Sequence, residues 1–109
     1  KSSESESVIK PKYNVKLLRI AEDDLNEIVM YIASDRPSAA EDVANKIEKN
    51  VGLLSKQPSL GRIPKEEDLA RLGYRYLVVE NYLIFYKIEG RTVYVHRILH
   101  GARDYLSLF

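Results

Sequence analysis

The residues of this chain best suited to move protons near neutral pH are its two histidines, His96 and His100. Imidazole titrates close to physiological pH, so either ring can act as a general acid or a general base. In an extended strand His96 shares a face with Tyr94 and Ile98, whereas His100 lies beyond the strand, in a turn. A histidine held by a hydrogen bond for structural reasons is the commoner case, and both interpretations stay open here.

The two histidines lack the companions that a metal site needs. Zinc sites combine several histidine, cysteine or carboxylate ligands. The chain has no cysteine, and no carboxylate cluster accompanies the histidine pair. We therefore expect no metal and no cofactor, and the missing cysteines also exclude disulfides and thiolate nucleophiles.

Three arginines are candidates for binding phosphate or an acidic target: Arg75, Arg97 and Arg103. The whole chain has a net charge of only +1, but residues 71–109 contain six basic against three acidic residues. A modest basic excess of this kind is compatible with phosphate contacts. The alternative places the arginines in surface salt bridges with the acidic residues of the same region, which are Glu80, Glu89 and Asp104.

The tyrosines outnumber the other aromatic residues, with eight Tyr against two Phe and no Trp. Most of them are expected at the core and its rim, because the ring is apolar and the hydroxyl polar. Tyr76, Tyr82 and Tyr105 are the candidates for stacking on nucleic-acid bases.

These side chains must be positioned by one small domain, since 109 residues suit a single core. Residues 1–11 begin with the polar stretch KSSESES and indicate a disordered tail or a remnant of cloning, so the domain is expected at residues 12–109. No apolar run approaches the roughly 20 residues that span a bilayer. We expect no membrane contact and a cytoplasmic location.

The first half of the domain predicts a strand and two helices. Residues 13–17 alternate apolar and polar side chains, as a half-buried strand does. Apolar residues then recur three or four apart from Ala21 to Ile32, a pattern typical of one helix face. Arg36-Pro37 ends that helix and opens a second one, whose apolar stripe continues to Leu54.

The second half predicts three strands in close succession, at residues 74–79, 82–88 and 92–99, after a loop with a short turn near 66–72. Short polar turns separate the strands, so we expect an antiparallel meander. The element order β-α-α-β-β-β predicts an α+β fold, in which a two-helix hairpin packs on a mainly antiparallel four-stranded sheet. The first strand is an outer or a central strand of that sheet, and a short helix or tail closes the chain.

This order and several short sequence segments resemble the RelE/ParE superfamily of toxins. The segments are AEDDLNEI at 21–28 with YIA at 31–33, PSLGR at 58–62, GYR at 73–75, YLIFY at 82–86 and VHRILHGARD at 95–104. Together they cover essentially the whole chain after residue 11. The closing RILHGARD favours the ParE and plasmid-stabilisation branch.

The resemblance implies the toxin of a type II toxin–antitoxin system, but the superfamily has two activities on one fold. RelE-like members cut messenger RNA on the ribosome with Lys and Arg side chains on the sheet and a Tyr near the C-terminus, whereas ParE-like members poison DNA gyrase. Aligned with the nucleases, Arg75 takes the first basic position, but Leu77 and Leu83 fall at or near two further cationic positions. An aliphatic side chain can neither donate to phosphate nor carry a proton.

We therefore favour a ParE-like toxin that arrests growth by inhibiting DNA gyrase and is neutralised by a cognate antitoxin. The alternative is a RelE-like nuclease acting on the ribosome and messenger RNA without a metal, so whether the chain is an enzyme stays open. Its catalytic candidates are Arg75, His96, His100, Arg103 and Tyr105. A third possibility is an inert paralogue kept as an antitoxin-binding module.

Overall fold

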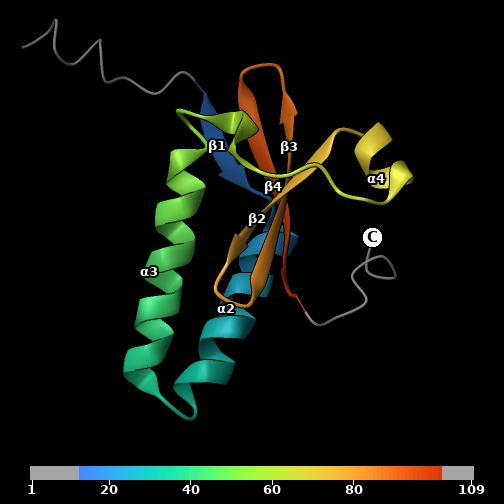
Figure 1. Ribbon diagram of the computed structural model, residues 1–109. Helices are drawn as coiled ribbons and strands as arrows, with labels where there is room; N and C mark the ends of the chain where they lie inside the picture. The colour runs from blue at the N-terminus through green and yellow to red at the C-terminus, as the bar shows by residue number, and fades with distance from the viewer. Residues whose placement is uncertain (1–12, 102–109) are drawn as a thin grey trace, which may run out of the picture.

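The computed structural model describes residues 13–101, in which one strand is followed by the helices and then by three strands, as shown in Figure 1. The elements follow in the order β1 (Asn14–Leu17), α2 (Arg19–Ala33), α3 (Pro37–Leu53), the 3-10 turn η1 (Pro58–Leu60), α4 (Glu67–Arg71), β2 (Tyr74–Val79), β3 (Tyr82–Glu89) and β4 (Thr92–His100). The tail expected at residues 1–11 and the short helix or tail expected at the C-terminus lie outside the described residues.

The four strands form one mixed sheet in the order β1-β4-β3-β2. Strands β2, β3 and β4 make the predicted antiparallel meander. Strand β1 pairs in parallel with β4, from Asn14 opposite Thr92 to Leu17 opposite Val95. The expected α+β fold with a mainly antiparallel sheet is confirmed, and of the two positions left open for β1 the structure takes the outer one.

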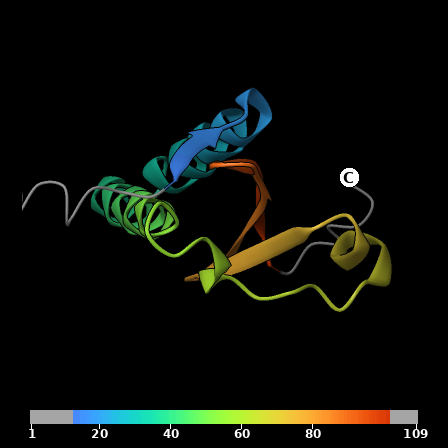
Figure 2. The ribbon, with the colours of Figure 1, turned by 90° about the horizontal axis from the view of Figure 1, so that it is seen from above.

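The helices α2 and α3 form the expected hairpin and pack against one face of the sheet. Proline at the start of α3 suits a first helical turn, where its missing N–H would have no partner in the helix anyway. Seen from above in Figure 2, α2 and α3 lie together, while α4 lies at the far end of β2. We call the side chains enclosed between hairpin and sheet the main core; its fully buried members include Ala21, Ile47, Leu54, Ile84, Tyr86, Val93 and Val95.

A second, smaller cluster covers part of the other face of the sheet. Leu69 of α4 packs there with Phe85 and Leu99, and Tyr74, Tyr76 and Leu83 surround them. Both faces of the sheet are therefore apolar near β2 and β3. No helix among residues 13–101 is long and apolar enough to cross a membrane.

Strand β4 contains a bulge that changes which side chains share a face. Phe85 pairs with Arg97 while the next residue, Tyr86, pairs with Val95, so His96 is an extra residue in β4. An extra residue breaks the two-residue alternation of a strand. Ile98 consequently joins Val95 in the main core, and the expectation that His96 and Ile98 share a face is wrong.

Candidate functional site

Arg75 is held by the loop that follows α3. Its Nη1 donates a hydrogen bond of 3.2 Å to the carbonyl oxygen of Gly61. The same loop is fixed by Tyr86, whose hydroxyl accepts from the Gly61 N–H at 2.8 Å and donates to the Pro58 carbonyl at 2.6 Å. Burial raises the pKa of Tyr86, while the Gly61 hydrogen bond and the charge of Arg75 oppose the rise. Arg75, a predicted target-binding residue, therefore also has a structural contact.

Gly61 itself lies where only glycine fits. A Cβ built there would stand 2.5 Å from the Tyr86 hydroxyl oxygen and 2.8 Å from the carbonyl oxygen of Tyr76. Real contacts between such atoms are longer, so a side chain would push the loop away from β2. The neighbouring Arg62 exchanges two backbone hydrogen bonds with Tyr76, of 2.8 and 2.9 Å, which fixes the loop along the outer edge of β2. The Tyr76 ring packs on Phe85, with ring centres 5.7 Å apart.

Arg97 forms a bidentate ion pair with Asp24 of α2. Its Nε lies 2.8 Å from Oδ2 and its Nη2 lies 3.1 Å from Oδ1. The Ile98 N–H also donates to Oδ2, at 3.1 Å. The hydrogen bond that Arg97 donates to Asp24 raises the pKa of Arg97. The side chains of Arg97 and Asp24 are only 16% and 11% exposed, so the pair is largely shielded from solvent. The pair joins β4 to α2 and is part of the packing of the domain.

Arg97 does form a salt bridge, as the second interpretation expected, but its partner is Asp24 and not Glu80, Glu89 or Asp104. Glu80, one of those expected partners, instead binds Lys46 of α3 at 2.6 Å, and this hydrogen bond raises the pKa of Lys46. Asp104, another expected partner, lies outside the described residues, as do the candidate site residues Arg103 and Tyr105.

His96 is half-buried against Tyr74. The Tyr74 hydroxyl lies 3.3 Å from Nδ1 of His96, and the two rings meet edge to face with centres 5.0 Å apart. Burial lowers the pKa of His96, and the positive charge of Lys87 lowers it further, although Glu89 opposes this. These surroundings favour the neutral form of the ring, which lies on the face of the sheet that carries the second cluster.

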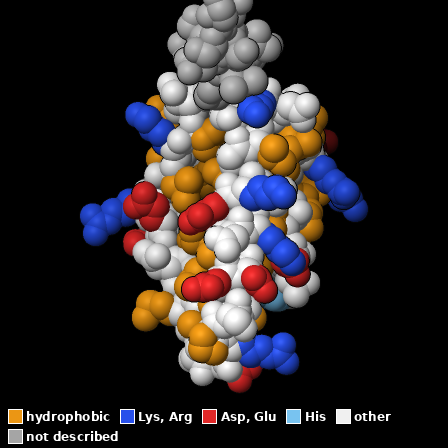
Figure 3. Space-filling view, turned by 90° about the vertical axis from the view of Figure 1, so that its left-hand side faces the viewer, with side chains coloured by type: hydrophobic (Ala, Val, Ile, Leu, Met, Phe, Trp, Pro, Cys, Tyr) orange, Lys and Arg blue, Asp and Glu red, His pale blue; other side chains and the backbone are white. Residues whose placement is uncertain are grey.

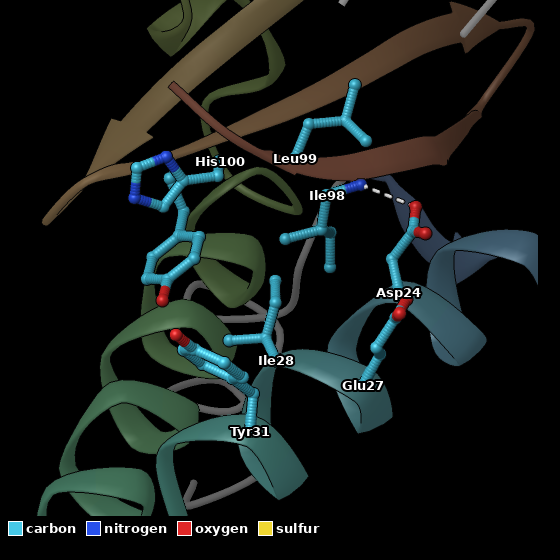
Figure 4. A pocket seen from close by; sticks show the side chains of 8 residues that line it. Asp24, Glu27, Ile28, Tyr31, Ile98, Leu99 and His100 are labelled. Carbon is cyan, nitrogen blue, oxygen red and sulfur yellow. Dashed lines mark hydrogen bonds between the residues drawn. The ribbon is translucent and has the colours of Figure 1, made fainter. Parts of the chain in front are cut away.

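His100 is the last residue of β4 and pairs with Tyr82 of β3, so the expectation that it lies beyond the strand in a turn is wrong. It borders a pocket of about 390 Å³. Its ring stands edge-on to Tyr82 with centres 5.4 Å apart. We call this the α2–β4 pocket, and Figure 4 shows it from close by. Its lining residues are Asp24, Glu27, Ile28, Tyr31, Tyr82, Ile98, Leu99 and His100.

The leucines at the aligned basic positions are both enclosed by apolar neighbours. Leu77 is 8% exposed and belongs to the main core. Leu83 packs against the second cluster. The described contacts of the candidate site residues differ. Arg75 binds the Gly61 carbonyl, His96 lies against Tyr74, Arg97 binds Asp24, and His100 lies against Tyr82.

Figure 3 shows the face that carries α3, where acidic and basic side chains alternate over apolar ones without a large area of one sign. Within residues 13–101 no three His, Asp or Glu side chains gather as a metal site would require. Sequence reasoning did not single out Glu27 or Tyr31 of the α2–β4 pocket. The available signal was Tyr31, an aromatic residue that does not fit the apolar stripe of its helix.

A family model described as the ParE toxin of the type II toxin–antitoxin system parDE matches residues 15–105. The chain belongs to this family. The fold of this ParE-family chain resembles that of the chromosomal ParDE TA system from P. aeruginosa, with a TM-score of 0.70, 21% identity, and coverage of 82% of this chain and 96% of that chain.

The ParE-family chain is also similar to the toxin–antitoxin complex RelBE2 from Mycobacterium tuberculosis. The TM-score is 0.59 and the identity 26%, covering 87% of this chain and 97% of the other. No curated protein sequence matches. The resemblance to the RelE/ParE superfamily is thereby confirmed.

Proposed function

We propose that this ParE-family toxin arrests growth by inhibiting DNA gyrase through protein contact, and that a cognate antitoxin neutralises it. The observation that carries the proposal is the position of Leu77 and Leu83. One is buried in the main core and the other packs on the second cluster. Neither position offers a cation to a phosphate, so charge stabilisation of the kind needed for RNA cleavage is missing there.

The surroundings of His96 support the same proposal. A general acid must reach its substrate by a hydrogen bond. The Nδ1 atom of His96 faces the Tyr74 hydroxyl, and the ring is half-buried with a lowered pKa. An imidazole with these contacts is better suited to linking β4 to β2 across the face of β3 than to protonating a leaving group.

The exposed apolar side chains of α2 support binding of an antitoxin. Met30 and Tyr31 are 72% and 80% exposed, and Ile20 on the same helix is 46% exposed. Exposed apolar side chains that lie together, as Met30 and Tyr31 do near the end of α2, commonly mark a protein-binding site. Both structural relatives are toxin–antitoxin assemblies, so the partner proposed for this surface is the antitoxin of the same operon.

The test runs two assays side by side on one preparation of toxin, purified with the product of the neighbouring reading frame and then freed from it. We expect inhibition of gyrase supercoiling and no new cleavage sites by primer extension on translated messenger RNA. Addition of the antitoxin should restore supercoiling. Cleavage of the messenger RNA with unaffected supercoiling would refute the proposal and favour the RelE-like alternative. In that case His100, which borders the α2–β4 pocket, would be a candidate catalytic residue.

Variants separate the two activities further. Tyr105→Phe removes only a hydroxyl, so it should leave growth arrest unchanged in a gyrase inhibitor, whereas the loss of a proton-transfer group costs about 10²–10⁴-fold in rate. In a gyrase inhibitor, replacing a side chain that contacts gyrase by alanine should weaken the binding of gyrase by about 1–3 kcal/mol. Arg103→Ala is the first such variant to make. Arg75→Ala and Arg97→Ala require a parallel measurement of stability, because both side chains hold the fold.

A further inference from the structure

The α2–β4 pocket has an acidic side, an aromatic side and an apolar floor. In Figure 4 the carboxylates of Asp24 and Glu27 lie to one side of Ile28 and Ile98, and Tyr31 lies to the other. The main chain of β4 closes the pocket opposite α2. These groups come from segments about seventy residues apart in sequence, which the hairpin and sheet bring together.

Within residues 13–101, one carboxylate of the pocket has no cationic partner. The charge of Asp24 is matched by Arg97, and its Oδ2 also accepts the Ile98 N–H. Among residues 13–101 no ion pair involves Glu27. The negative charge of Glu27 acts on Arg97 at a distance and contributes to the raised pKa of that residue. The pocket therefore presents one uncompensated negative charge beside apolar side chains.

The aromatic side offers ring faces and hydroxyl groups. Tyr82 is held edge-on by His100, with ring centres 5.4 Å apart. Burial raises the pKa of Tyr82 and the nearby Tyr31 raises it further, so the phenol is uncharged at physiological pH. A cation over the face of a tyrosine ring is attracted by the ring electrons, and more strongly where water is excluded.

We propose that the α2–β4 pocket binds a guanidinium group, supplied by an arginine of the cognate antitoxin; this inference rests on the proposed function. A guanidinium is planar, so it can stack on a tyrosine ring while it donates two hydrogen bonds to one carboxylate. The ammonium of lysine is a compact point charge, which offers neither the planar stack nor the paired donor geometry. The volume of about 390 Å³ is at the lower end for ligand sites, which suits one side chain better than a large cofactor.

Tyr31 is the residue that such an arginine would cover. It is 80% exposed in the described chain and lies at the pocket entrance next to Met30, which is 72% exposed. Arginine and tyrosine are enriched among the residues that dominate binding energy at interfaces. The pocket and the apolar end of α2 would thus form one continuous antitoxin-binding surface.

The first experiment uses the toxin alone and N-acetyl-arginine amide as the probe, with N-acetyl-citrulline amide as its uncharged match. Nuclear magnetic resonance should show saturable shifts of the Tyr31 and Tyr82 ring signals with the arginine probe only. Glu27→Gln should weaken this binding about threefold to fivefold, the range for a partly exposed ion pair. Glu22→Gln, an exposed acidic residue of the same helix outside the pocket, is the control and should change nothing.

Equal shifts with both probes, or no loss in Glu27→Gln, would overturn the inference. Binding that appears only in an Arg103→Gln variant would also overturn it, because the pocket would then belong to an arginine of the toxin itself. The thermal stability of every variant is measured first, so that a folding defect is not taken for lost binding.

The second experiment measures the affinity of the antitoxin for the same variants. Glu27→Gln and Tyr31→Ala should each raise the dissociation constant at least about fivefold, while Glu22→Gln stays within about twofold of the wild type. Unchanged affinity in both pocket variants refutes the inference and leaves the proposed function standing. If the wild type binds no antitoxin, the proposed function fails, and the guanidinium site is decided by the arginine probe.

Discussion

The hydroxyl group of Tyr86 should make a large contribution to the folding stability of this domain. The residue is fully buried, and its hydroxyl accepts one hydrogen bond from Gly61 and donates another to Pro58. Tyr86→Phe keeps the ring and its packing and removes only this oxygen. Two backbone groups of the loop after α3 then lose their partner, and the Gly61 N–H is buried.

The expected loss follows from these two contacts. A hydrogen bond contributes about 1 kcal/mol on balance, and a buried donor left without a partner costs about 1–3 kcal/mol. Tyr86→Phe should therefore lower the free energy of unfolding by about 2–4 kcal/mol, a large part of the roughly 5–15 kcal/mol typical of a domain. The melting temperature should fall by at least about 8 °C in a domain of this size.

Urea denaturation followed by circular dichroism measures this loss. Tyr94→Phe is the matched control, because the Tyr94 hydroxyl makes no hydrogen bond within residues 13–101. It should change the free energy of unfolding by less than about 0.5 kcal/mol. Hydrogen exchange should show the Gly61 amide losing protection in Tyr86→Phe. A loss below about 1 kcal/mol, or equal losses in the two variants, would refute the assignment of the tyrosine as the anchor of the loop.

Three further changes test other parts of the structure. Gly61→Ala should cost about 1–3 kcal/mol in urea denaturation, because the new Cβ clashes with the buried tyrosine; Gly52→Ala, where a Cβ meets nothing within 4 Å, should cost nothing. Asp24→Ala should lower the free energy of unfolding by about 2–3 kcal/mol, because it removes the carboxylate that Arg97 binds. If the effects of Asp24→Ala and Arg97→Ala add up in a double-mutant cycle, the two side chains are not coupled and this reasoning is wrong. Because burial lowers the pKa of His96, the unfolded chain takes up the proton first, so stability should fall as the pH drops below about 6.5. His96→Gln should flatten that fall in thermal scans, and an unchanged slope would count against it.

The element order could be predicted from the sequence because each segment has a clear period. The apolar stripes from Ala21 to Ile32 and from Ala40 to Leu54 fall on the faces of α2 and α3 that build the main core. The three β segments lie within a residue of the observed β2, β3 and β4. Local hydrophobic patterning dictates these features, and tertiary contacts do not overrule it.

The position of β1 and the bulge at His96 could not be predicted in this way. An outer and a central strand have similar alternation over four residues, so the sequence left both open for β1. A bulge adds one residue to a strand without changing its composition. The faces assigned to His96 and Ile98 therefore came out wrong, although the strand itself was placed correctly.

The contacts of the candidate site depend on residues that are far apart in sequence. Asp24 and Arg97 are separated by 73 positions, and Gly61 and Tyr86 by 25. No local pattern links such pairs, so the sequence suggested the wrong partners for Arg97. The α2–β4 pocket was missed for the same reason, since Glu27 and His100 meet only after the hairpin has folded onto the sheet.

The parallel pairing of β1 with β4 sets the order in which a newly made chain can fold. Strand β4 is an inner strand that pairs with both β1 and β3, and within residues 13–101 it is the last strand in sequence. Pairing over such a separation is slow, because the entropy of closing the intervening loop must be lost first. If synthesis stops before Thr92, the released chain lacks β4. Strand β1 then has no neighbour, and β3 can pair only with β2. Interrupted synthesis should thus yield no folded fragment of the domain, and degradation rather than partial toxicity should be the fate of such fragments.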